Sequence, residues 1–242
     1  HTANGDPAMM VANPEEAMAG LRLLREYATP GTILSFGLET ADPAVTEANN
    51  LNIDADGCLE AIRMVNEVGR DRGPNGMPWV LPGLNFVTGL DGETRKTFDL
   101  NFEFLKRILQ EDLWVRRINI RQVRPVRREF VPLEYHRQFR QFKERVRTEV
   151  DHEMLRRVVP EGTVLRNVYT ELAEGHTTFG RQVATYGLLV GVPYDVPLNR
   201  FVDVKVTGHG QRSLTGVEYP FDVNTASMRA IASLPGIGEK RA

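Results

Sequence analysis

The feature that most constrains the fold is the alternation of helix-type and strand-type patterns over the first 158 residues. Asn13, Pro14 and two acidic residues are typical of a helix start. Asp54 precedes a second helix-type segment, in which Cys58 and Ile62 share one face at helical spacing. The expected strands are residues 32–38, 79–87 and 113–123, and further helices are expected at 94–110 and 132–158. Alternation of this kind predicts parallel strands joined by right-handed crossovers.

The pattern changes after residues 160–162. The following segments are short, rich in β-formers and separated by turn residues; they cover 163–172, 178–184, 188–192, 201–207 and 212–217. Their spacing predicts a small antiparallel barrel of about five strands. We therefore expect an α/β domain at 1–158, a small β-barrel at 159–220 and a helical tail at 221–242.

Charge and cysteine content limit the functional classes. Thirty basic and thirty-two acidic residues give a net charge of -2, so any binding of nucleic acid must come from local patches or backbone geometry. The single cysteine, Cys58, excludes an internal disulfide and indicates a reducing, cytoplasmic setting. No apolar run approaches the roughly 18 residues of a membrane span. Residues 1–7 contain loop-type residues without an initiator Met, which suggests part of a longer chain.

The tail carries the most specific pattern. Residues 224–227 (NTAS) precede an amphipathic segment that leads into residues 234–242, LPGIGEKRA. Gly236 and Gly238 would permit a sharp turn and expose backbone amides at the start of a following helix, which is an anion site. Ile237 would fill the space between the two helices, and Lys240 and Arg241 would add positive charge. The tail resembles the helix-hairpin-helix of DNA-uptake and repair proteins, although it is cut short at Ala242. A glycine-rich turn between core helices, or a protein-contact module, is the alternative.

Three stretches of the α/β part place polar or glycine residues at strand ends. They are residues 36–42 (FGLETAD), 81–94 (LPGLNFVTGLDGET) and 117–123 (RINIRQV). The carboxyl ends of strands in βα units gather functional groups, and glycines permit close approach of a ligand. The alternative is that Glu39 and Glu93 only bind the turns that follow them, and that Arg121 and Gln122 are core polar groups.

The order Gly-Leu-Glu-Thr, then Gly-x-Asn-x-x-x-Gly-x-x-Gly-Glu-Thr, resembles the second half of a radical S-adenosylmethionine (SAM) barrel. It is most similar to the branch of the tRNA methylthiotransferases, in which a TRAM domain of the OB type follows the catalytic barrel. With the tail added, the chain from Gly31 to Ala242 resembles a mainly archaeal family of radical SAM proteins. The resemblance implies the C-terminal half of a partial TIM-like (β/α) barrel, an OB/TRAM-like antiparallel barrel and a truncated helix-hairpin-helix.

The same resemblance implies a set of cofactor-binding residues. Glu39 and Thr40 would lie near the ribose and methionine part of SAM. The adenine side would be lined by Gly83, Asn85 and Gly89. Arg121 and Gln122 would face the cofactor or substrate.

Two departures from the family stand out. The Cys-x-x-x-Cys-x-x-Cys loop that holds the [4Fe–4S] cluster is absent, and Cys58 lies on the apolar face of an expected helix. We expect the cluster loop upstream of His1 in a full-length protein, unless the chain is not an enzyme. Residues 124–128 (RPVRR) also stand where the relatives have a Pro-Gly-Thr turn.

Other features exclude some enzyme classes. The five histidines do not pair at metal-ligand spacing, which disfavours a zinc site, and no phosphate-loop pattern occurs. The long helix at 132–158 interleaves both charge signs, which is typical of a solvated face, with a basic nucleic-acid-binding side as the alternative.

The leading hypothesis is part of a radical SAM iron–sulfur enzyme that modifies a nucleic acid, RNA rather than DNA. Such an enzyme would use an electron donor. A non-catalytic nucleic-acid-binding protein is the main alternative, and a tail that contacts proteins is a third.

Overall fold

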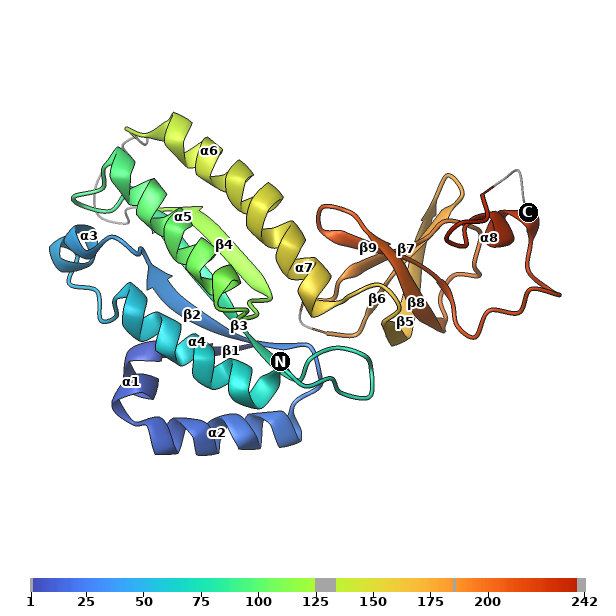
Figure 1. The fold of residues 1–242 in the computed structure, drawn as a ribbon, viewed down its shortest axis with the longest axis horizontal. Coiled ribbons are helices and arrows are strands. Elements are labelled where there is room, and N and C mark those ends of the chain that lie inside the picture. Colours follow the sequence, from blue (N-terminus) through green and yellow to red (C-terminus); the bar gives the residue numbers. More distant parts are fainter. Residues whose placement is uncertain (1, 125–133, 185, 239–242) are drawn as a thin grey trace.

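The computed structural model describes residues 2–124, 134–184 and 186–238, and its first half is built on a parallel sheet (Figure 1). The strands are β1 (Thr2–Gly5), β2 (Thr32–Glu39), β3 (Val80–Thr88) and β4 (Arg117–Gln122). They are parallel and lie side by side in the order of the chain. The expected C-terminal half of a partial TIM-like barrel is wrong: within the described residues the sheet is a plain open one of four strands, whereas a TIM barrel is a closed sheet of eight.

The connecting helices lie on one face of this sheet (Figure 1). Right-handed crossovers between strands in sequential order produce this arrangement. The helices are α1 (Pro7–Ala12), α2 (Pro14–Tyr27), α3 (Pro43–Ala48), α4 (Ala55–Gly69) and α5 (Arg95–Gln110). The long helix expected at 132–158 is a rod made of α6 (His136–Arg145), the π-helical turn η1 (Val146–Asp151) and α7 (His152–Val158).

Alternate residues of β2 and β3 enter the core beneath the helices. On β2, Leu34, Phe36 and Leu38 are buried, as are Leu84 and Phe86 on β3. The residues between them point to the opposite face, because side chains alternate along a strand. That face carries mostly polar side chains and glycines, while hydrophobic burial secures the side of the sheet that the helices cover.

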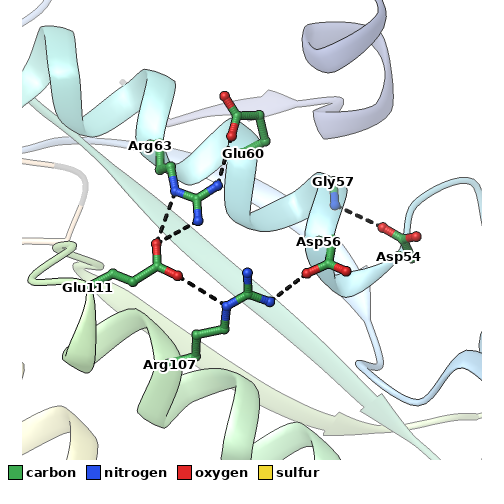
Figure 2. A network of polar contacts seen from close by, with 7 residues as sticks. All are labelled: Asp54, Asp56, Gly57, Glu60, Arg63, Arg107 and Glu111. Carbon is green, nitrogen blue, oxygen red and sulfur yellow. Dashed lines mark hydrogen bonds and ion pairs between the residues drawn. The ribbon is translucent and has the colours of Figure 1, made fainter.

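On the solvent side of the helices, a network of charged side chains joins α4 to α5 (Figure 2). Arg63 pairs with Glu60 at 2.8 Å and with Glu111 at 2.7 Å. Arg107 pairs with Asp56 at 2.5 Å and with Glu111 at 3.1 Å. Glu111 thus connects the two arginines, and the network fixes the packing of the two helices from the solvent side.

The first residues are structured, contrary to the loop expected there. Residues 2–5 form β1, and Asp6 caps α1, because its carboxylate accepts hydrogen bonds from the backbone of Ala8 (3.0 Å) and Met9 (3.3 Å). A strand of four residues is too short to show a clear alternation, which explains why the sequence pattern missed it.

The second half is a closed barrel whose strands are ordered β5-β6-β7-β9-β8. The strands are β5 (Val164–Glu174), β6 (Thr177–Gln182), β7 (Leu189–Val192), β8 (Phe201–His209) and β9 (Ser213–Glu218). The barrel is OB-like, as expected. The expectation that it is wholly antiparallel is wrong, since β9 inserts between β7 and β8 and runs parallel to β7.

The loop before β3 attaches the barrel to the α/β half. The carbonyl oxygen of Asn75 accepts hydrogen bonds from the backbone of Arg166 (3.1 Å) and from the side chain of Gln182 (2.7 Å). Gly76 packs so closely that a Cβ there would overlap the carbonyl oxygen of Val164. Across the described ranges, no helix is long and apolar enough to cross a membrane.

Candidate functional site

The uncovered face of the sheet forms cross-strand rows of small and polar residues. One row pairs Ser35 with Gly83, and Gly83 with Arg117. The next row pairs Gly37 with Asn85, and Asn85 with Asn119. Neighbouring side chains cover both glycines: a Cβ on Gly83 would lie 2.8 Å from Cγ2 of Ile33, and a Cβ on Gly37 would lie 2.7 Å from Oε1 of Glu39.

A chain of hydrogen bonds orders the polar side chains of this face. Arg117 Nε donates to Asn119 Oδ1 at 2.9 Å. Asn119 Nδ2 donates to Asn85 Oδ1 at 2.8 Å, and Asn85 Nδ2 donates to the carbonyl oxygen of Phe36 at 3.2 Å. These bonds fix the amide orientations and connect the start of β4 to the middle of β2.

Glu39 is the most unusual residue of the site. Its φ angle is 63°, a left-handed conformation, and it follows an irregularity in the pairing of β2 with β3. Its Oε1 would lie 2.7 Å from a Cβ on Gly37, so the carboxylate lies over that glycine on the uncovered face. Its Oε2 is buried and has no hydrogen-bond partner among the described residues. Burial raises the pKa of Glu39, and the positive charge of Arg121 partly opposes this effect.

The residue after Glu39 has a structural role. Thr40 is 1% exposed, and its hydroxyl donates to Asn101 Oδ1 at 3.2 Å. The backbone N–H of Ala41 donates to the same oxygen at 2.6 Å. These bonds join the end of β2 to α5, which turns Thr40 into the core and away from Gly37 and Asn85.

The other predicted cofactor-binding residues are dispersed along β3 and β4. Gly83 lies near the start of β3, whereas Gly89 follows its end with a φ of 86°. The N–H of Gly89 donates to Glu93 Oε2 at 3.0 Å, so Glu93 binds its own turn. Arg121 lies opposite Val87 in the strand register and is exposed. Gln122 lies opposite Thr88, so its side chain points to the other face of the sheet. The structure thus brings Glu39, Asn85 and Arg121 to one face and leaves Thr40 apart from them.

The tail lies beyond the barrel, at the opposite end of the molecule from the strand ends (Figure 1). A helix, α8 (Met228–Ala232), precedes Gly236 and Gly238, whose φ angles are 83° and 62°. The N–H of Ile237 donates to the carbonyl oxygen of Leu234 at 3.1 Å. The expected second helix, Lys240 and Arg241 lie outside the described residues, as do residues 125–128 of the unusual RPVRR stretch.

Sequence reasoning missed a basic cleft beside the start of β4. An opening of about 380 Å³ lies between β4, α7 and the barrel, and Arg116, Arg117, Tyr186 and Arg212 are among its lining residues. The alternation in residues 117–121 was visible in the sequence, but the contribution of residues 186–189 and 211–212 was not, because only the docking of the barrel brings them there.

The described residues contain no cluster of His, Cys, Asp or Glu that could hold a metal ion. Cys58 is fully buried, and burial, with a smaller effect of Asp54, raises the pKa of its thiol to about 12. A thiol of this kind does not fit a cluster ligand, which must be deprotonated and accessible.

Comparison with known proteins finds uncharacterized archaeal relatives. The chain is 42% identical over 225 residues to an uncharacterized protein of Methanocaldococcus jannaschii, covering 89% of this chain and 41% of that protein. It is 40% identical over 243 residues to an uncharacterized protein of Archaeoglobus fulgidus, covering 98% of this chain and 46% of the relative. The chain therefore spans less than half the length of these relatives. No protein-family model matches it.

Proposed function

We propose that the chain is part of a radical SAM enzyme that acts on a nucleic acid, RNA rather than DNA, and that its parallel sheet binds SAM. The observation that carries the proposal is Glu39, a strained residue whose buried carboxylate oxygen has no partner among the described residues. The proposal concerns this open sheet and its strand ends.

The backbone conformation and the unpaired carboxylate of Glu39 destabilise the folded protein unless a ligand binds the carboxylate. A left-handed conformation costs a non-glycine residue about 1–2 kcal/mol. A buried oxygen without a hydrogen bond adds a further penalty. Strain of both kinds in one residue is typical of binding sites, where the surrounding structure enforces it.

SAM supplies the groups that this site lacks. Its ribose hydroxyls and its amino group are hydrogen-bond donors, which suit the Glu39 carboxylate. Asn85 is already held by Asn119 and presents an ordered polar side chain beside Gly37. SAM would supply the radical chemistry when bound, while these residues bind and orient it.

The iron–sulfur cluster does not fit the residues of this chain, because Cys58 is a buried thiol on α4. The relatives are more than twice as long as the part matched, and the cluster ligands belong, on this proposal, to the remainder of the full-length protein.

The assignment of a nucleic acid as substrate is supported by the OB-like barrel. Barrels with this strand order bind oligonucleotides or oligosaccharides on the surface of their second and third strands and adjoining loops. Those strands correspond to β6 and β7, which lie beside the basic cleft. The choice of RNA rests on the resemblance to the tRNA methylthiotransferases.

Calorimetric titration of the full-length protein with SAM tests the cofactor site. Wild type should bind saturably, and Glu39→Gln should lose most of the affinity. Glu93→Gln is the matched control, since Glu93 is also a glutamate with a raised pKa near the strand ends but is satisfied by the N–H of Gly89. Equal affinity of the two variants would remove Glu39 from the site. After anaerobic reconstitution, absence of both four-iron absorbance and SAM cleavage would contradict the enzyme class.

A non-catalytic nucleic-acid-binding protein is the second candidate, favoured by the arginine-lined cleft beside the OB-like barrel. It predicts that the full-length protein binds oligonucleotides but not SAM. Saturable SAM binding that depends on Glu39 would exclude it.

A further inference from the structure

A basic groove follows the free edge of β4, the last strand of the sheet. The cleft of about 380 Å³ is continued by a second one of about 160 Å³, and the two share Ile118, Asn119, Asp151 and Arg212. Because common residues line both, they form one groove from the barrel along β4 to η1.

The walls of this groove carry an excess of positive charge. Its cationic residues are Arg116, Arg117, Lys143, Arg147, Arg181 and Arg212. Asp151 is the one carboxylate among the described lining residues, and it pairs with Arg212 at 3.3 Å. Arg181 and Arg147 pair with carboxylates outside the lining, Glu171 and Glu144. Since the whole chain has a net charge of -2, this concentration is local and would attract an anion to this place.

Two of the arginines are held in position without a carboxylate. Within the described residues, neither Arg116 nor Arg117 forms an ion pair. Arg116 Nη2 donates to the carbonyl oxygen of Tyr186 at 3.0 Å, and Arg117 lies 3.5 Å from the centre of the Tyr186 ring. Arg117 Nη1 is buried and lacks a hydrogen-bond partner in the described part of the chain. Burial lowers the pKa of Arg116 to about 10, so it stays cationic at neutral pH.

The floor of the groove differs from its walls. It includes the apolar residues Met154, Leu155 and Val158 of α7. Tyr186 stands at the entrance with 40% of its surface exposed. An aromatic ring, an apolar floor and a basic rim together suit a ligand with flat bases and a charged backbone. The larger cleft is of the size that takes one small organic group, and it is too small for a duplex.

We infer that this groove binds single-stranded nucleic acid, with a base at Tyr186 and phosphates at the arginines. The inference rests on the proposed function and adds to it the place and the strandedness of the substrate. The strand would run along β4 toward the strand ends, and at roughly 3.3 Å per residue Arg117 and Gln122 are about 17 Å apart. The hydrogen-bonded row from Arg117 to Asn85 lies between the groove and Glu39.

Fluorescence anisotropy with a labelled 12-nucleotide single strand tests the inference on the full-length protein. Arg212→Gln should weaken binding about fivefold and reduce the slope of log affinity against log salt by about 0.7, the loss of one phosphate contact. Tyr186→Leu should weaken binding about fivefold or more through lost stacking, with an unchanged salt slope. Asp151→Asn should tighten binding, an effect that a purely structural role would not produce.

Arg166→Gln is the matched control. Arg166 also pairs with an aspartate, Asp203 at 2.7 Å, and its side chain is 51% exposed against 62% for Arg212. Its affinity and salt slope should equal those of the wild type. Thermal unfolding of each variant verifies that the fold is retained.

The outcomes separate the groove from the proposed function. Wild-type binding that none of the groove variants changes would overturn the groove but leave nucleic-acid binding in place. Absence of wild-type binding to RNA and DNA alike would overturn both. Equal competition by poly-glutamate or by free nucleotides would also overturn the groove as a nucleic-acid site, assigning it to an acidic protein or a small molecule.

Discussion

Replacement of Glu39 by glutamine should stabilise the protein while it removes a ligand contact. Glutamine keeps the shape of the side chain but removes its charge, and because the Glu39 carboxylate is only half-buried, solvent screening limits the cost of that charge to about 1 kcal/mol. In a chain of this size, 1 kcal/mol corresponds to about 2–4 °C in Tm. Glu39→Gln should therefore raise the Tm at pH 7 by this amount.

The pH dependence identifies the cause. The pKa of Glu39 is higher in the folded protein than its usual value of 4.5, so ionisation disfavours the folded state. The penalty is absent below the unfolded-state pKa and grows as the pH rises through the folded-state pKa. The stabilisation by Glu39→Gln should therefore be present at pH 7 and vanish near pH 4. Glu39→Gly should gain about another 1 kcal/mol at both pH values, because glycine relieves the left-handed strain.

Binding of SAM should make the wild type more stable than Glu39→Gln, the reverse of the order without ligand. At a SAM concentration 100 times the Kd, binding stabilises the wild type by about 2.7 kcal/mol, whereas Glu39→Gln gains little. Urea unfolding at pH 4 and pH 7, with and without SAM, measures all these differences. A Glu39→Gln variant that is less stable than the wild type at pH 7 without SAM would contradict this explanation. A gain in its stability that is still present at pH 4 would contradict it too.

Three further changes test the packing around the site. Asn101→Ala should cost about 2–3 kcal/mol in urea unfolding, because it leaves the buried N–H of Ala41 without its acceptor; a loss below 0.5 kcal/mol, on the order of a surface change, would contradict that role. Glu111→Gln should cost about 1 kcal/mol or less at low salt. The hydrogen bond from Arg63 is the largest cause of the lowered pKa of Glu111. The stability that Glu111 contributes should therefore be lost as the pH falls through its folded-state pKa, and a cost of Glu111→Gln that is unchanged at pH 2.5 would contradict this. Gly180→Ala should destabilise the barrel by about 1–3 kcal/mol, since a Cβ would overlap a backbone carbonyl of β5, and a wild-type Tm would show that the barrel can shift there.

Apart from β1, α1 and α3, the sequence predicted the elements of both halves, because those elements have strong local signals. The apolar run at 32–38 corresponds to β2. The helical spacing after Asp54 corresponds to α4, where the N–H of Gly57 donates to the N-cap side chain of Asp54 at 2.8 Å. Turn residues separated the five strands of the barrel closely enough to predict its size. The parallel pairing of β7 with β9 was missed, since register between distant strands leaves no trace in local spacing.

The candidate site was only partly predictable. Glu39 and Asn85 share the uncovered face. Thr40 directly follows Glu39 in the sequence, but its side chain points into the core toward Asn101. The direction of adjacent side chains at a strand end depends on backbone conformation, here the positive φ of Glu39. Tyr186 could not be predicted for the groove, because its position depends on how the barrel docks.

A crystal structure of the full-length protein with SAM would show whether the cofactor binds Glu39. We expect a ribose hydroxyl or the amino group of SAM within hydrogen-bond distance, about 3 Å, of the Glu39 carboxylate, with the cofactor on the face that carries Gly37 and Asn85. SAM bound away from this face, or a Glu39 carboxylate that still lacks a partner in the complex, would contradict it.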